Sequence, residues 1–249
     1  MLRNIKLTLE YDGTNFRGWQ IQSAKERTIQ GEIQNALKKI LKTKINLFGS
    51  GRTDAGVHAQ GQVANFKTIS SMTLIEFKKA LNANLPDDIS ILNVEEVALK
   101  FHAQYSATKK TYRYTILNRQ VRACQDRHFC LHYPYKLNVT LMRKEIKSLV
   151  GRKDFKSFQS ADPHRVKNTS TIRTIKKINL KKHRDYLSIE IEGTGFLYKM
   201  VRNIVGTLLE IGNGRLPKGS MSSILTKKNR AFAGIPAPAR GLSLIDVKY

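Results

Sequence analysis

Two successive stretches of the chain carry the same order of strand and helix patterns, and this repeat constrains the fold more than any other feature. In the first stretch, apolar and polar residues alternate over 5–11 as in a half-buried strand, and apolar residues at helical spacing over 29–41 follow a candidate N-cap at Thr28. The order β-α-β-β-α-β is completed by short apolar runs at 45–49 and 62–67, a helix from a capping box at Thr73 and Glu76 to about Asn84, and a strand near 89–97.

The second stretch repeats this order with one short helix inserted. Its expected elements are a strand over 112–116, a helix over 141–150, a hairpin of strands at 171–181 and 186–192, a long helix over 196–211, a short helix near 219–227 and a last strand over 242–247. Such units form an antiparallel sheet covered by helices on one face. The pattern therefore predicts an α+β fold of two ferredoxin-like halves, 1–105 and 106–249, in one continuous, mostly antiparallel sheet with an active-site cleft between the halves.

The charge of the chain points to a polyanionic partner. Its 249 residues include 44 Lys and Arg against 19 Asp and Glu, a formal net charge of +25, while 41% of residues are hydrophobic, enough for a packed core. Lysine and arginine gain affinity by releasing the counterions condensed on phosphates. Nucleic acid is therefore favoured over an acidic membrane surface or no polyanion. Candidate phosphate contacts lie in the basic stretches 119–136 and 153–170, the latter with Lys153, Lys156, His164, Arg165 and Lys167.

Cysteine usage and hydropathy indicate a cytoplasmic protein. The two cysteines, Cys124 and Cys130, lack the spacing of a zinc site or a disulfide framework. The N-terminus alternates like a strand instead of carrying the apolar block of a signal peptide. The most apolar stretch, 196–211, contains four charged or amide side chains, so we expect no membrane span.

The glycine-rich segment GSGRTDAGVHAQG at 49–61 holds the most suggestive chemistry, because Asp54 is the only acidic residue from Phe48 to Ile75. The glycine spacing fits neither a P-loop nor a dinucleotide site. One local carboxylate also disfavours a metal-dependent nuclease and a paired-acid glycosidase. Asp54 then acts alone as a nucleophile or base, or it is a turn or N-cap residue. Arg52 is placed to reach a phosphate or a vacated base position, and His58 is more typical of a structural histidine.

Two further segments carry candidate site residues. Aromatic and cationic residues interleave over 105–114, the combination that stacks bases and neutralises phosphates; Tyr112 and Tyr114 share one strand face, so one of them can instead belong to the core. Arg202 lies among apolar residues of the predicted long helix. A buried arginine needs an anionic partner, for which Asp54 is a candidate, and a surface arginine is the alternative.

Five motifs together resemble the tRNA pseudouridine synthase A family over nearly the whole chain. They are GRTDAGVHAQGQV around Asp54, EYDGTNFRGWQ at 10–20, NANLP at 82–86, FHAQYSATKKTYRY at 101–114 and GTGFLYKMVRNIVG at 193–206. The C-terminal PARGLSLIDVKY also fits, whereas Lys199 departs from the histidine more often found there.

This resemblance implies a cofactor-free and metal-free homodimer that converts uridine to pseudouridine at positions 38, 39 and 40 of the tRNA anticodon arm. It implies that Asp54 is the catalytic aspartate, that Tyr112 stacks on the target base, that Arg202 pairs with the aspartate, and that Arg52 helps to hold the flipped nucleotide. The N-terminal half then carries the aspartate loop, and the C-terminal half carries the tyrosine and the arginine helix. A non-catalytic RNA-binding protein and a metal-dependent RNA-processing enzyme are the alternatives.

Overall fold

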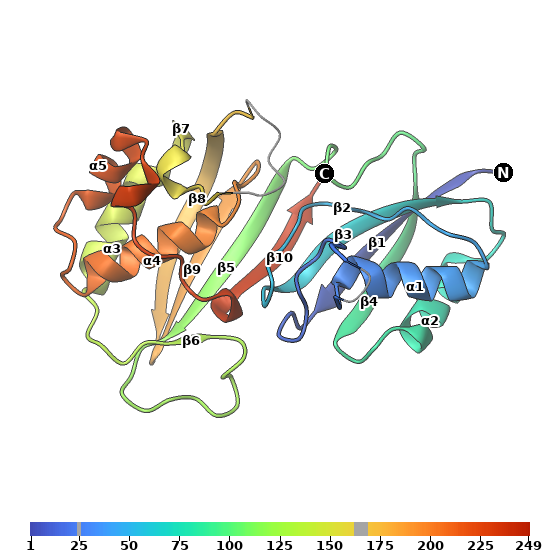
Figure 1. The fold of residues 1–249 in the computed structure, drawn as a ribbon, viewed down its shortest axis with the longest axis horizontal. Coiled ribbons are helices and arrows are strands. Elements are labelled where there is room, and N and C mark those ends of the chain that lie inside the picture. Colours follow the sequence, from blue (N-terminus) through green and yellow to red (C-terminus); the bar gives the residue numbers. More distant parts are fainter. Residues whose placement is uncertain (24–25, 162–168) are drawn as a thin grey trace. The chain divides into compact units, whose positions relative to one another are not determined.

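The computed structural model describes residues 1–23, 26–161 and 169–249, which form two compact units (Figure 1). The first unit comprises Met1–Thr108 and Ser243–Tyr249, and the second comprises Lys109–Leu242. The last strand thus belongs mainly with the first unit, whereas the sequence pattern assigns it to the second half. The predicted phosphate contacts His164, Arg165 and Lys167 lie outside the described residues.

The first unit contains the six elements that the sequence predicts. They are β1 (Arg3–Tyr11), α1 (Ile29–Leu41), β2 (Phe48–Gly49), β3 (His58–Thr68), α2 (Leu74–Asn84) and β4 (Ile89–Val97). Strand β1 is antiparallel to both β3 and β4, and the short β2 is antiparallel to β3. The C-terminal strand β10 (Leu242–Lys248) lies parallel to β3, with Ser243 opposite His58.

Local capping fixes where both helices of the first unit begin. The Thr28 side chain accepts a hydrogen bond from the Gly31 N–H at 3.2 Å. At α2, the Glu76 N–H donates to Thr73 Oγ1 while the Thr73 N–H donates to Glu76 Oε2, which completes the predicted capping box. Both predicted helix starts are confirmed.

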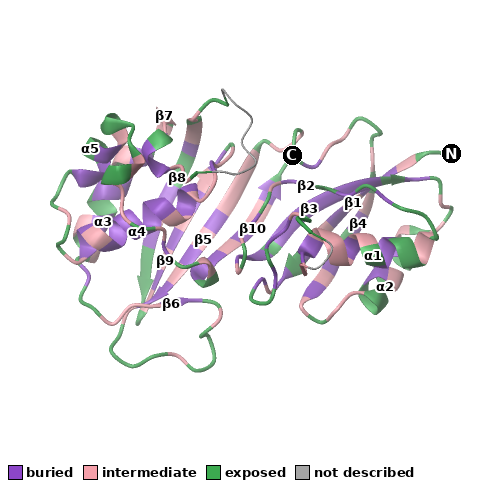
Figure 2. Cartoon of the chain, in the orientation of Figure 1, coloured by how far each residue is buried: buried purple, intermediate pink, exposed green. Residues whose placement is uncertain are grey.

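The core of the first unit lies between one sheet face and the two helices, where the buried residues of β1, α1 and α2 gather (Figure 2). Ile5, Leu7 and Leu9 are fully buried on that face, and Phe66 meets Phe77 of α2 edge to face at 5.8 Å between ring centroids. This arrangement follows from the alternation of β1, which places every second side chain on the helix side.

The opposite sheet face of the first unit binds the segment after β4 through two buried asparagines. Asn4 Nδ2 donates to the carbonyls of Ala98 and Phe101 at 3.0 and 2.9 Å. Asn65 Oδ1 accepts the Ala103 N–H at 2.8 Å, and Asn65 Nδ2 donates to Asn4 Oδ1 at 2.9 Å. Residues 98–103 therefore lie fixed against β1 and β3.

The second unit has a four-stranded antiparallel sheet in the order β5-β9-β8-β7, with β6 parallel to β5. Its elements are β5 (Lys109–Leu117), β6 (Leu131–His132), α3 (Val139–Glu145), β7 (Gly151–Asp154), β8 (Ile172–His183), β9 (Tyr186–Gly193), α4 (Met200–Gly212) and α5 (Ser220–Lys227). Short 3-10 turns cover Ile146–Leu149, Lys156–Phe158, Arg230–Phe232 and Ala239–Gly241. The predicted β8–β9 hairpin and the inserted helix α5 are confirmed.

Four elements of the second unit differ from the prediction, among them the two-residue strand β6, which no sequence pattern indicates. The helix expected over 141–150 is α3 followed by a 3-10 turn, and the charged strand β7 was not predicted. The helix expected from Phe196 begins at Met200, because Lys199 adopts the left-handed conformation with φ 56°. The apolar residues before Lys199 pack in an irregular segment, and helical spacing alone cannot distinguish that from a helix.

The α+β class and the mostly antiparallel strand pairing are confirmed. The cleft between the halves and the division of roles between them stay predictions. Among the described residues, no helix is both long enough and apolar enough to cross a membrane.

Candidate active site

Asp54 lies in the loop between β2 and β3, where the chain turns sharply. Its carbonyl accepts the Val57 N–H at 3.1 Å across a turn in which Gly56 has φ 76°. Glycine suits this conformation because a side chain at positive φ is strained. Asp54 is half-buried and Arg52 is exposed. Asp54 therefore occupies a turn and not a helix N-cap, and both predicted residues of the first unit lie on this one loop.

A second segment, residues 12–19 after β1, runs along the Asp54 loop and holds its backbone. The Trp19 N–H donates to the Thr53 carbonyl at 3.0 Å, and the Gly56 N–H donates to the Phe16 carbonyl at 3.3 Å. A Cβ on Gly18 would lie only 2.5 Å from the Thr53 oxygen. The glycines of EYDGTNFRGWQ thus permit the close backbone approach on which the loop depends.

Buried polar side chains hold the loop from the sheet side. The Tyr11 hydroxyl and Thr53 Oγ1 are 2.8 Å apart, directly before Asp54 in the chain. Gln62 of β3 accepts from Ser50 Oγ at 2.6 Å and donates to the Gly51 carbonyl at 3.0 Å. Burial raises the pKa of Tyr11 to about 12, so its hydroxyl stays protonated at neutral pH.

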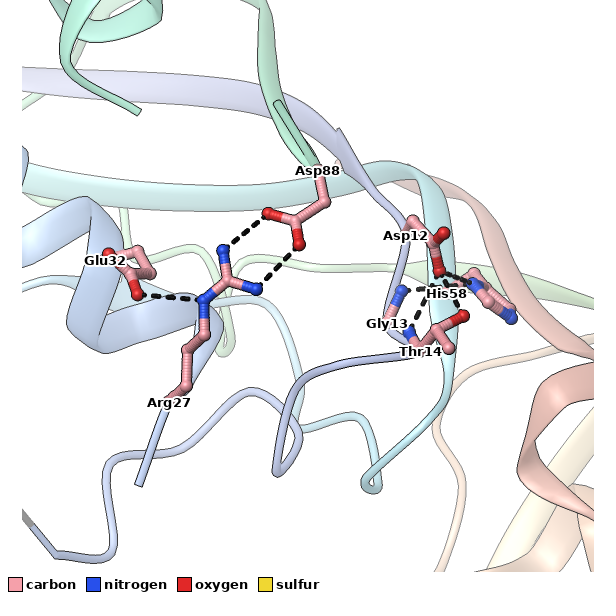
Figure 3. Close-up of polar contacts among 7 residues, drawn as sticks. All are labelled: Asp12, Gly13, Thr14, Arg27, Glu32, His58 and Asp88. Atoms are coloured by element: carbon pink, nitrogen blue, oxygen red, sulfur yellow. Dashed lines mark hydrogen bonds and ion pairs between the residues drawn. The ribbon is translucent and has the colours of Figure 1, made fainter. Parts of the chain in front are cut away.

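His58 joins the end of the Asp54 loop to the segment after β1 (Figure 3). Its Nδ1 lies 3.0 Å from the Gly13 nitrogen and 3.1 Å from Asp12 Oδ1. Because Nδ1 accepts from the Gly13 N–H when it carries no proton and donates to Asp12 when it carries one, these are alternative hydrogen bonds. Asp12 Oδ1 also accepts from the Thr14 N–H at 2.9 Å. In either case His58, which is the first residue of β3, is hydrogen-bonded to the start of the segment at residue 12 or 13.

Arg27 and Asp88 form a second polar contact that supports the same segment (Figure 3). Its guanidinium donates to both carboxylate oxygens of Asp88 at 2.7 and 2.8 Å and to Glu32 at 3.2 Å. The hydrogen bonds that Arg27 donates to Asp88 raise the pKa of the guanidinium above its ordinary value. The Asp12 N–H donates to the Asp88 carbonyl, so the Arg27–Asp88 pair is joined to the start of the segment.

Tyr112 and Tyr114 of β5 have different environments within the second unit. Tyr112 is buried and meets Phe196 edge to face, with 5.1 Å between ring centroids. Tyr114 is fully buried, its hydroxyl donates to the Pro238 carbonyl at 2.7 Å, and burial raises its pKa. Tyr114 is therefore the core tyrosine of the pair.

Arg202 is half-buried on the first turn of α4, and the segment that precedes β10 fixes its position. Its Nε donates to the Ala237 carbonyl at 2.8 Å, while the Ala237 N–H donates to the Arg202 carbonyl at 3.0 Å. A Cβ on Gly206, one turn later, would lie 1.8 Å from the Ile235 oxygen. The close approach of residues 235–237 to α4 thus leaves the Arg202 guanidinium little freedom.

The sequence pattern missed the residues that hold the Asp54 loop: Tyr11, Thr53, Gln62, Arg27 and Asp88. Tyr11, Thr53 and Gln62 lie within the recognisable motifs, whereas Arg27 and Asp88 lie outside all five. Nothing local to any of these residues indicates which pairs meet. Among the described residues, no three His, Cys, Asp or Glu side chains gather as a metal site would need.

Comparison with known proteins identifies the family. A family profile described as tRNA pseudouridine synthase matches residues 8–106 and 146–249. The chain is 47% identical over 250 residues to tRNA pseudouridine synthase A of Geobacillus sp. (strain WCH70), covering 100% of this chain and 99% of that protein. It is 46% identical over 248 residues to the Caldicellulosiruptor bescii protein of the same name and 44% identical over 248 residues to that of Thermoanaerobacter sp. (strain X514), each over 100% of both chains.

Among solved structures, a Cbf5–Nop10–Gar1 complex is similar over 96% of this chain and 57% of the matched chain. The identity is 11% and the TM-score 0.35, a likeness too low to inform the fold. The family profile and the full-length relatives decide the identity: the chain belongs to the tRNA pseudouridine synthase family and is an isomerase that acts on tRNA.

Proposed function

We propose that the chain isomerises uridine to pseudouridine at positions 38, 39 and 40 in the anticodon stem-loop of tRNA, with Asp54 as its single catalytic carboxylate. The observation that carries the proposal is the Asp54 loop itself. A half-buried carboxylate stands in a glycine turn whose backbone is held by Trp19, Phe16 and Gln62. Such preorganisation is what a reacting group requires and what an ordinary surface turn does not need.

The reaction requires one carboxylate and no external reagent. The N1–C1′ glycosidic bond breaks, the uracil turns in place, C5 joins C1′, the C5 proton leaves, and N1 takes up a proton in its place. Atoms and electrons balance without redox change or added water. Asp54 acts by attack on C1′, by attack on the uracil ring, or by removal of the C2′ proton, and these alternatives stay open. Closure of the site against water favours each of them.

The remaining roles follow from the resemblance, residue by residue. Arg52, exposed beside Asp54, helps to hold the flipped nucleotide, because a guanidinium suits phosphate contact. Tyr112 stacks on the target base and so offsets part of the cost of unstacking it. Arg202 pairs with the reacting carboxylate. A homodimer that works in the cytoplasm completes the proposal.

Replacement of Asp54 by asparagine tests the proposal, because it removes the charge and keeps the shape. Tritium release from tRNA labelled at uridine C5 reports removal of the C5 proton directly. We expect Asp54→Asn to release no tritium while it binds tRNA as tightly as the wild type. Asp87→Asn, at an exposed aspartate on the loop before β4, is the matched control and keeps full activity.

Substantial tritium release by Asp54→Asn would contradict the assignment of Asp54 as the catalytic carboxylate. Chemical mapping of pseudouridine in the product tests the positions, and labelling outside 38–40 would contradict the anticodon-arm assignment. The same reaction in EDTA separates this chemistry from a metal-dependent one, which would stop.

A further inference from the structure

Three aromatic rings of the first unit stack on one another at the surface, and none has a role in the proposed reaction. His102 lies between Phe48 and Tyr105, with ring centroids 4.9 Å from Phe48 and 4.4 Å from Tyr105. The His102 and Tyr105 rings are tilted by only 32°. Tyr105 is 80% exposed and Phe48 is 43% exposed. We call Phe48, His102 and Tyr105 the aromatic platform.

The platform is rigid because its backbone is tied down. The N–H groups of Gln104 and Tyr105 point at His102 Nδ1 from 3.1 and 3.4 Å, and the His102 N–H donates to Ser106 Oγ at 3.1 Å. The next residue, Ala103, is fixed by Asn65, and Asn65 is also the strand partner of Phe48. Rings held in this way lose little conformational entropy when a ligand stacks on them.

The charge around the platform indicates the class of ligand. No Asp or Glu occurs over residues 97–108 of the first unit, which contain the exposed Lys100. None occurs over 33–53 either, the stretch that contributes Phe48 and ends next to Asp54. A polyanion is therefore attracted to both segments that build the platform. Exposed aromatic rings among cations are the usual means of binding unpaired nucleotides.

We propose that the aromatic platform binds an unpaired base of the RNA substrate by stacking on the exposed face of Tyr105, outside the catalytic residues. The inference rests on the proposed function, since it takes the tRNA substrate as the ligand. A base in a loop offers a free face, whereas a base within a paired stem is already covered by its neighbours. The platform therefore contacts a loop nucleotide, and its contribution tolerates any base identity.

Binding of unmodified tRNA to Tyr105 variants tests the platform. Because Tyr105→Ala removes the stacking of one base, we expect it to raise Kd about tenfold, which corresponds to about 1.4 kcal/mol. Tyr105→Phe keeps the ring and restores the affinity. The salt dependence of log Kd keeps its slope in Tyr105→Ala, because no phosphate contact is lost. Phe232→Ala removes an exposed ring outside the predicted phosphate-binding stretches, 47% exposed, and keeps the wild-type Kd.

A second measurement requires no variant. Photo-cross-linking of tRNA that carries 5-iodouridine in the anticodon loop is expected to label Tyr105 or His102. Unchanged affinity in Tyr105→Ala, equal weakening in Phe232→Ala, or labelling only elsewhere would each overturn the inference. A change in the sedimentation coefficient of Tyr105→Ala without a change in its Kd for tRNA would also overturn the inference. It would indicate that the platform is a protein–protein interface. Failure of the proposed function is separate: the wild type would then form no pseudouridine at all.

Discussion

The Tyr11 hydroxyl lies 2.8 Å from Thr53 Oγ1 in a buried hydrogen bond that joins the end of β1 to the residue directly before Asp54. The bond spans 42 residues of sequence and links the sheet directly to the Asp54 loop of the first unit. A buried hydroxyl that loses its partner cannot turn to solvent. The Tyr11 phenol therefore helps to fix the position of the Asp54 loop.

Removal of that phenol hydroxyl tests this role. We expect Tyr11→Phe to lower the free energy of unfolding by about 1–3 kcal/mol, because the Thr53 hydroxyl is left buried without this partner. We expect a lower kcat with little change in tRNA affinity, since the loop moves and the RNA-binding surface does not. Urea unfolding and tritium release measure the two effects. Tyr186→Phe is the control: its hydroxyl donates to Asp126 at an exposed site, so the loss is smaller. Equal effects of the two variants would contradict the prediction.

The raised pKa of Tyr11 also predicts that the protein loses stability at alkaline pH. Burial raises this pKa from 10.0 to about 12, so between these values the unfolded chain releases the phenol proton while the folded chain keeps it. Stability from this group is thus complete below pH 10 and is lost as the pH rises toward 12, by about 1.4 kcal/mol per pH unit. Other buried tyrosines act in the same direction, so the informative quantity is the difference between wild type and Tyr11→Phe. That difference, measured by urea unfolding, should be constant below pH 10 and shrink by pH 11. A constant difference to pH 11 would exclude the shift.

Gly18 and Gly214 form a matched pair for the close backbone approach at the Asp54 loop. Both have positive φ, 93° and 85°, so alanine brings similar strain of about 1–2 kcal/mol at each. A Cβ on Gly18 also meets the Thr53 oxygen at 2.5 Å, whereas a Cβ on Gly214 meets no described heavy atom within 4 Å. We expect Gly18→Ala to be less stable than Gly214→Ala and to lose most of its activity, while Gly214→Ala keeps full turnover. Similar activity in both variants would show that the loop tolerates displacement from residues 12–19.

The elements of the first unit are predictable because their signals are local. Thr28 and the Thr73–Glu76 box fix both helix starts within a single turn, and β1 alternates cleanly. The start of α4 is not predictable in this way, because the left-handed Lys199 stops an apolar pattern that otherwise continues the helix. The edge strand β7, with the sequence GRKD, shows no alternation at all.

The residues of the candidate site also differ in whether local sequence signals predict them. Asp54 is recognisable because it is an isolated acid among glycines in a basic chain. Its supports are not, because they form between distant residues: Arg27 and Asp88 pair across 61 positions, and Tyr11 reaches Thr53 across 42. Each partner taken alone is an ordinary charged or aromatic residue, and only the fold brings the pairs together.

Glu145 of α3 supplies the N-terminal cap that α5 lacks from its own sequence. Gly219 stands at the cap position and has no side chain, and the buried Glu145 carboxylate accepts the N–H groups of Gly219 and Met221 at 2.6 and 3.1 Å. We expect Glu145→Gln to lower the free energy of unfolding by about 1–2 kcal/mol, because the amide loses the charge that the helix N-terminus stabilises and presents only one acceptor oxygen. Glu210→Gln removes a surface pair with Arg215 and should cost less. Pseudouridine formation by Glu145→Gln at low temperature should equal that of the wild type, since the carboxylate supports helix packing alone. A drop in turnover without a drop in unfolding free energy would contradict this role, and urea titration followed by circular dichroism provides the comparison.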